Sequence, residues 1–140
     1  MSTNDRPYAA KNVFFAAGVG AAAAIAANFI LYFAGLGLGV TFEGEFGPGV
    51  NAIPVAGLVG GAIVPALAGA GLLLALNRWT QKPGLIFTII SVVFTLLSFG
   101  SPLGVPGIST GSIVFMELMH VASAAAIAGA LVVLGRKPAA

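Results

Sequence analysis

Apolar residues form four long runs in this chain, and short polar or glycine-rich stretches separate the runs. The runs cover residues 12–40, 53–77, 83–100 and 110–134. Each is close to the roughly 20 residues that an α-helix needs to cross the hydrocarbon core of a bilayer. None alternates polar and apolar residues as membrane-spanning strands do, and a barrel needs about eight or more such strands. The pattern predicts an all-α membrane protein, a four-transmembrane-helix bundle in a single domain over residues 1–140.

The breaks between the runs carry residues that suit helix ends. Residues 41–51 form a turn-rich loop, and Pro54 fits the first turn of the second helix, where its missing N–H costs little. The stretch GSPLGVPG at 100–107 holds two prolines and three glycines, so it cannot continue the third helix. The hydroxyl of Ser109 or Thr110 is expected to cap the fourth helix.

Composition agrees with the membrane assignment. Charged residues make up 7% of the chain, whereas a soluble domain carries roughly a quarter. So few charges cannot cover a water-facing surface, and the lipid bilayer is therefore the main expected partner. The basic residues flank the apolar runs, which suits anionic lipid headgroups and not nucleic acid. The chain has no cysteine, which excludes disulfides and thiolate metal sites.

The basic residues also predict the orientation. They lie before the first helix, between the second and third, and after the fourth: Arg6, Lys11, Arg78, Lys82, Arg136 and Lys137. With four spans, all of them fall on one side of the membrane. The positive-inside rule then places both termini in the cytoplasm and the 41–51 loop, with Glu43 and Glu45, outside.

Small residues recur at helical spacing on three of the predicted helices. They are Ala17, Ala21, Ala24, Asn28 and Gly35 in the first, Gly57, Gly61, Ala68, Gly71 and Ala75 in the second, and Ala124 and Ala128 in the fourth. Lipid gives helices no hydrophobic reason to associate, so close contact of small residues must supply the attraction. We expect these faces to meet, with Gly57 and Gly61 touching another helix. Pro65 should kink the second helix and leave the Gly61 carbonyl without its usual donor.

Polar residues at similar depths suggest a pocket within the membrane. Glu117 and His120 share one face of the fourth helix, ~10 and ~15 Å below its outer end at a rise of ~1.5 Å per residue. Ionisable residues at such depth are costly, so they are functional candidates. Four further polar residues come from the first and third helices: Asn28, Tyr32, Thr95 and Ser98. These six residues are the predicted ligand-binding or polar cluster.

Each of these residues also has a structural interpretation. Serine and threonine hydroxyls in membrane helices usually bond to their own backbone. Asn28 can join two helices, Tyr32 can be an interface aromatic, and Glu117 can be a neutral acid bonded to His120 or to the Gly61 carbonyl. A hydroxyl would join helices at a lower desolvation cost than Glu117 or His120, which keeps the functional interpretation open for that pair.

The sequence identifies neither catalytic residues nor a metal site. A Glu-x-x-His pair occurs in di-iron bundles, but those sites need carboxylates from other helices, and Glu117 is the single acid within the predicted spans. The chain has one histidine, so it cannot hold a haem between two histidines. The cofactor is left unknown, and the balance is against an enzyme.

Three separated motifs carry a family resemblance. They are ANFILYFAGLGLGVTFEGEFGPG at 27–49, the proline that opens the second helix, and LMH at 118–120. Together they resemble an uncharacterised family of small bacterial four-helix membrane proteins, a domain of unknown function seen mainly in actinobacteria and related groups. The resemblance implies four spans and a multi-pass protein of the bacterial inner (cytoplasmic) membrane. It implies no activity.

These observations leave three functions open. The first is an integral membrane protein that binds or transports a small or lipid-soluble molecule in an intramembrane polar pocket. The second is a structural or accessory subunit of a larger membrane complex, or a homo-oligomer, favoured by the tiny extramembrane parts. The third is a membrane enzyme acting on a lipid-soluble substrate such as a quinone, with His120 and Tyr32 as proton donors.

Overall fold

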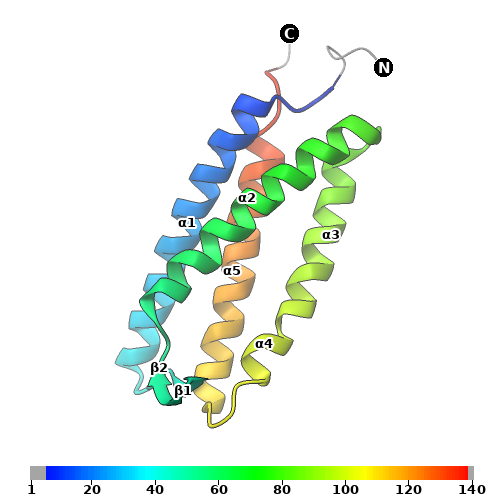
Figure 1. The fold of residues 1–140 in the computed structure, drawn as a ribbon. Coiled ribbons are helices and arrows are strands. Elements are labelled where there is room, and N and C mark those ends of the chain that lie inside the picture. The colour runs from blue at the N-terminus through cyan, green and yellow to red at the C-terminus, as the bar shows by residue number, and fades with distance from the viewer. Residues whose placement is uncertain (1–5, 139–140) are drawn as a thin grey trace.

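The protein is a bundle of four long helices with both described ends of the chain on the same side (Figure 1). The computed structural model describes residues 6–138, so the ends of the predicted 1–140 range lie outside it. The helices are α1 (Ala10–Gly37), α2 (Val55–Trp79), α3 (Pro83–Ser98), α4 (Gly100–Leu103) and α5 (Thr110–Leu134). Four spans are long and apolar enough to cross a membrane, α3 and α4 forming one of them, Pro83–Leu103. The prediction of an all-α protein with four membrane-crossing helices is confirmed.

Local chemistry explains where α5 begins and where α3 is interrupted. The Ser109 side chain caps α5 by accepting a hydrogen bond from the Ser112 N–H at 3.1 Å. The third helix ends at Ser98, before the predicted residue 100. The helix breaks close to GSPLGVPG as the sequence predicted, but the sequence did not predict that Gly100–Leu103 forms the single turn α4, with Pro102 buried. Proline is tolerated there because the first turn of a helix needs no N–H from it.

The loop between α1 and α2 is a short β-hairpin, which the sequence did not predict. Strand β1 (Glu43–Gly47) pairs with β2 (Gly49–Ala52) in antiparallel register, with an irregularity between Gly44 and Gly47. Gly49 turns the chain with a φ of 81°, a conformation that glycine adopts without strain. The hairpin lies at the end of the bundle opposite to the two described ends of the chain (Figure 1).

The tightest packing joins α1 to α5. A Cβ built on Gly20 would lie 2.9 Å from the Cα of Ile127 and 3.2 Å from the Cβ of Ala130, so only a glycine fits at this position. The predicted small face of α1 is largely buried, including Ala17, Ala24 and Asn28. These contacts supply the close approach that helix association in lipid requires.

The packing face of α2 differs from the predicted one. Its buried residues are Leu58, Ala62, Ala66, Ala70, Leu73 and Asn77. The alanines and Leu73 share one core cluster with residues of α1 such as Val13 and Ala24. The prediction that Gly57 and Gly61 touch another helix is wrong: a Cβ on Gly61 would meet no atom within 4 Å, and one on Gly57 would meet a ring carbon of the nearby Pro54. The glycine face of α2 looks into open space because the neighbouring α3 stands away from it.

A polar bridge joins α1, α2 and α5 near the middle of the bundle. Asn28 Nδ2 donates to the Leu58 carbonyl oxygen at 3.4 Å, and Ser123 Oγ donates to Asn28 Oδ1 at 3.0 Å. Asn28 is 5% exposed, so its amide would be costly to bury without these partners. The bridge confirms the structural interpretation of Asn28 as a residue that joins helices.

A second set of polar contacts closes the bundle at the terminal end. Tyr8 is buried, and its backbone N–H and C=O both pair with the side-chain amide of Asn77, at 3.4 and 3.0 Å. Tyr8 also forms an isolated antiparallel β-bridge with Arg136, which follows α5. The Lys137 N–H donates to the Pro7 carbonyl at 2.8 Å. The two ends of the described chain and the end of α2 are thus held together at the end of the bundle that carries the basic residues.

The α1–α5 contact generates a stability prediction. Gly20→Ala should lower the thermal midpoint and reduce the free energy of unfolding by about 1–3 kcal/mol, because the added methyl forces the two backbones apart. Gly18→Ala is the matched control, since a Cβ on Gly18 meets nothing within 4 Å. Unfolding in detergent, followed by circular dichroism, measures both variants. Equal effects of the two substitutions would contradict a tight seam at Gly20.

The polar bridge generates a coupling prediction. Asn28→Leu and Ser123→Ala should each destabilise the protein, and the double variant should lose less than the sum of the two losses. Hydrogen bonds between membrane helices typically contribute about 0.6 kcal/mol and at most about 1.7 kcal/mol, which sets the expected coupling. A double-mutant cycle of unfolding free energies measures it. Strict additivity would mean that the two side chains do not interact.

Candidate functional site

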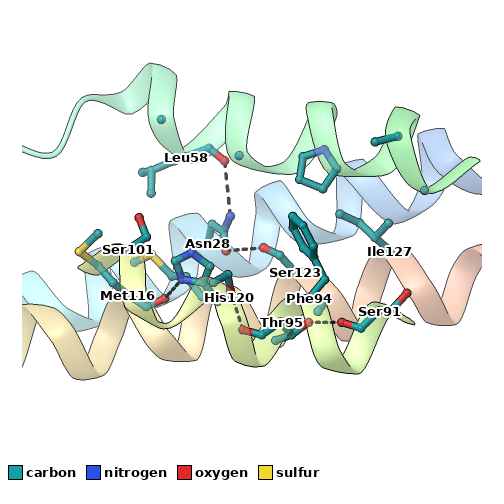
Figure 2. A pocket seen from close by; sticks show the side chains of 18 of the residues that line it. Asn28, Leu58, Ser91, Phe94, Thr95, Ser101, Met116, His120, Ser123 and Ile127 are labelled. Atoms are coloured by element: carbon teal, nitrogen blue, oxygen red, sulfur yellow. Dashed lines mark hydrogen bonds between the residues drawn. The ribbon is translucent and has the colours of Figure 1, made fainter. Parts of the chain in front are cut away.

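A cavity of about 590 Å³ lies between α2, α3 and α5 (Figure 2). The α2 wall includes Gly57, Gly61 and Pro65. Two of these residues have no side chain and the third has only a small ring, so this face of α2 fills little space. The floor is formed by α5, with Met116, Met119 and His120. Most of the remaining wall is apolar, including Phe87 and Phe94 of α3. The space exists because the glycine face of α2 is opposite a helix that does not approach it closely.

The cavity is open on the side where α2 and α3 diverge. Phe94 lines the cavity and is 68% exposed, and Gly61 and Pro65 on the facing helix are also exposed. These residues lie within the spans, at the level of the hydrocarbon core. The opening between the helices therefore faces the region that lipid chains occupy.

His120 projects from α5 into the cavity, where its ring is held in one orientation. Its Nδ1 lies 2.7 Å from the Met116 carbonyl oxygen, one turn earlier in the same helix (Figure 2). A carbonyl oxygen can only accept a hydrogen bond, so Nδ1 carries a hydrogen, and in a neutral ring this is the single N–H. Nε2 has no hydrogen-bond partner in the part of the chain that the structure describes. The neutral ring thus presents a free acceptor at the cavity wall.

The hydroxyls of α3 each bond to the helix backbone. Ser91 donates to the Phe87 carbonyl at 2.9 Å, Thr95 to the Ser91 carbonyl at 2.7 Å, and Ser98 to the Thr95 carbonyl at 2.7 Å. This confirms the expectation that membrane hydroxyls bond to their own backbone. All three residues line the cavity, so the oxygen atoms remain there as acceptors with their hydrogens already used.

Four of the six predicted site residues line this cavity: Asn28, Thr95, Ser98 and His120. Tyr32 is not among the lining residues and packs instead against the rings of Phe42 and Phe33, with centroids 4.9 and 5.6 Å apart. Phe42 has a φ of 51° and is fully buried, so this strained residue turns its ring into the bundle beside Tyr32. Tyr32 therefore does not line the cavity together with His120, although the enzyme hypothesis had paired the two as proton donors.

Glu117 is not on the cavity wall either. Both of its carboxyl oxygens are shielded, and neither has a hydrogen-bond partner within residues 6–138. The i,i+3 spacing to His120 does not join the two side chains, because the His120 ring bonds to Met116 instead. The hydrogen bonds of Glu117 to His120 or to the Gly61 carbonyl, which the structural interpretation expected, are therefore not formed.

Several residues that line the cavity were not predicted from the sequence. Ser123 lies three residues after His120 and faces the same space, and Met116 and Met119 lie on the same side of α5. Their helical spacing from His120 was a usable signal. Ser101 of α4 could not be placed, because the helix that carries it was not predicted. Within residues 6–138, no group of three His, Cys, Asp or Glu side chains is arranged to hold a metal ion.

Comparison with known proteins gives a family but no activity. No curated protein and no solved structure matches the chain. A family model described as "Family of unknown function (DUF6069)" matches residues 8–137, which includes all the helices and every residue of the cavity. The chain, a four-span membrane protein, belongs to this DUF6069 family of unknown function.

Proposed function

We propose that the protein binds a lipid-soluble molecule in the cavity between α2, α3 and α5. The observation that carries this proposal is an apolar cavity with a few fixed polar groups, open sideways within the membrane spans. Ligand sites commonly have volumes of about 300–1,000 Å³, mostly apolar walls and a small number of polar groups. The cavity, at about 590 Å³ with His120 on its floor, has these properties.

Binding is better supported than transport of a hydrated solute. The wall carries mainly apolar side chains such as Leu58, Phe87, Phe94 and Met119, which suit a molecule that partitions into lipid. Such a molecule can enter from the bilayer between α2 and α3 without crossing water. A transport role would need a second route out of the cavity.

An accessory-subunit role is the second candidate, and the exposure of α3 favours it. Pro83 and Phe87 are the buried residues of this helix. A further groove of about 450 Å³ runs between α3 and α5, with Ala125 and Gly129 on its wall. Small residues permit a helix of another subunit to approach closely. Stoichiometric co-purification of a second membrane protein, together with absence of a bound lipophile, would favour this role.

The orientation belongs to the same proposal. We place both termini and the α2–α3 turn in the cytoplasm and the β1–β2 hairpin outside, in the inner membrane of a bacterium, with residues 1–140 as one domain. The support is the separation of charge: Arg78, Lys82 and Arg136 lie at one end of the bundle, and Glu43 and Glu45 at the other (Figure 1).

Filling the cavity tests the binding function. Gly61→Leu should abolish saturable labelling of the cavity residues by a photoreactive alkylphenol, while the thermal midpoint stays close to that of the parent, because the new side chain enters open space. Gly71→Leu is the matched control: Gly71 is on the same helix and also faces open space, but it does not line the cavity. Mass spectrometry of the labelled protein in lipid nanodiscs measures the result. Equal labelling of both variants and the parent would contradict binding in this cavity.

Single-cysteine labelling tests the orientation, since the chain has no cysteine of its own. A membrane-impermeant maleimide added to intact cells should react with Gly47→Cys in the hairpin and not with Arg78→Cys at the end of α2. Permeabilised cells should give reaction at both positions. Reaction of Arg78→Cys but not of Gly47→Cys in intact cells would reverse the topology.

A further inference from the structure

We infer that the molecule bound in the cavity is a lipophilic hydrogen-bond donor, such as a phenol or an alcohol, whose hydroxyl donates to Nε2 of His120. This inference rests on the proposed binding function and adds the chemical class of the ligand. It follows from counting the hydrogens that the polar groups of the cavity have left to donate.

The first step is the state of His120. Because its Nδ1 hydrogen is donated to the Met116 carbonyl at 2.7 Å, the neutral ring has no N–H left for a ligand. Nε2 offers a lone pair on the cavity floor. A ligand hydroxyl is the natural partner for it within a medium that holds little water.

The second step is the state of the neighbouring hydroxyls. Ser91, Thr95 and Ser98 donate their hydrogens to carbonyls of α3, and Ser123 donates its hydrogen to Asn28. A hydroxyl has one hydrogen and two lone pairs, so each of these groups can still accept but has nothing left to donate.

The third step is the backbone of α2. Pro65 has no N–H, so the Gly61 carbonyl lacks the donor that an unbroken helix would give it. Gly61 and Pro65 both line the cavity, so this carbonyl adds a further acceptor to the same wall. Gly61 also has no side chain that would keep a ligand away from it.

Few donors remain to balance these acceptors. Among the described side chains that line the cavity, they are the second amide hydrogen of Asn28 and the hydroxyl of Ser101. Asn28 is 5% exposed and already bonds on both sides, which leaves it little contact with a ligand. The cavity is therefore matched to a molecule that gives a hydrogen, and an acceptor-only molecule would leave His120 Nε2 unpaired.

The apolar walls of the cavity further restrict the class of ligand that fits. Phe87 and Phe94 give the α3 side aromatic surfaces, and Met116 and Met119 give the floor flexible, polarisable ones. Aromatic rings pack well against such groups. A ring-bearing alcohol fits both the walls and the acceptor, so alkylphenols are the chosen probes.

The test uses the single histidine of the chain. The parent protein, carrying ring-labelled histidine, is placed in lipid nanodiscs and titrated with para-hexylphenol or with its methyl ether, para-hexylanisole. Nitrogen NMR should show the hydrogen on Nδ1 in the free protein. The phenol should shift the Nε2 signal saturably in the direction of an accepted hydrogen bond, and the ether should not.

Competition against the photoreactive alkylphenol gives the affinities. At equal concentrations in the membrane, the phenol should displace the label about tenfold more effectively than the ether, the scale of one hydrogen bond between ligand and site. His120→Phe should remove this preference by weakening the phenol. Leu118→Phe is the control, since Leu118 is 47% exposed and lies outside the cavity, and it should keep the preference.

The outcomes separate the inference from the function on which it rests. Saturable binding of phenol and ether with equal strength and equal effect on Nε2 would overturn the donor requirement and leave the binding function standing. A hydrogen found on Nε2 in the free protein would also overturn it. No saturable binding of either molecule would overturn the proposed function itself. The NMR measurement uses the parent protein, so its result does not depend on the folding of a variant.

Discussion

Close contact between small residues is the interaction on which this structure depends, because lipid gives apolar helices no other strong reason to associate. Gly20 lets the backbone of α1 approach that of α5 at Ile127, and the alanines of α2 continue the same core. The third helix has no alanine and a single glycine, Gly84. The Tyr8 hydroxyl fills the space beside Gly84, so this glycine does not bring α3 close to α2. The helix is therefore fixed near its start and by α4 at the other end, but it stands away from α2 in between. The cavity is the direct result of that uneven distribution of small residues.

The same low-dielectric setting decides what the polar groups do. An unpaired donor or acceptor is costly there, so nearly every polar hydrogen near the cavity is already given to a protein acceptor. Asn28 and Ser123 use theirs to hold three helices together, and the α3 hydroxyls use theirs on their own backbone. What remains accessible is mainly lone pairs, with Nε2 of His120 as the most prominent. Because the protein's own hydrogen bonds use these donors, the site would prefer a ligand that donates a hydrogen bond.

The sequence was sufficient for the features that depend on local chemistry. Run length predicted the spans, and the hydroxyl of Ser109 marked the start of α5. The sequence was not sufficient to predict which helix packs against each face of a given helix. Glycines at helical spacing suit close contact and an open wall equally well, so the prediction that Gly61 contacts another helix was wrong.

Tertiary context also decided the site residues that the sequence misplaced. Phe42 adopts a backbone conformation that a residue with a side chain rarely takes, and its ring packs against Tyr32, which does not line the cavity. Helical spacing correctly indicated that Asn28 and His120 reach the same space, because both lie on faces that converge near the middle of the bundle. Spacing could not show that the His120 ring turns toward Met116, or that the Glu117 carboxyl has no hydrogen-bond partner among the described residues.

In this structure α3 stands off from α2, and the space between the two helices is the proposed ligand site, open to the bilayer. An electron cryomicroscopy map of the protein in nanodiscs of native lipids, with a rigid binding fragment as a marker of orientation, tests it most directly. The map should show separated helices at the level of Gly61 and Phe94, with density for a bound molecule beside His120. A map in which α3 packs against the Gly61 face of α2, with side chains filling the space, would contradict it.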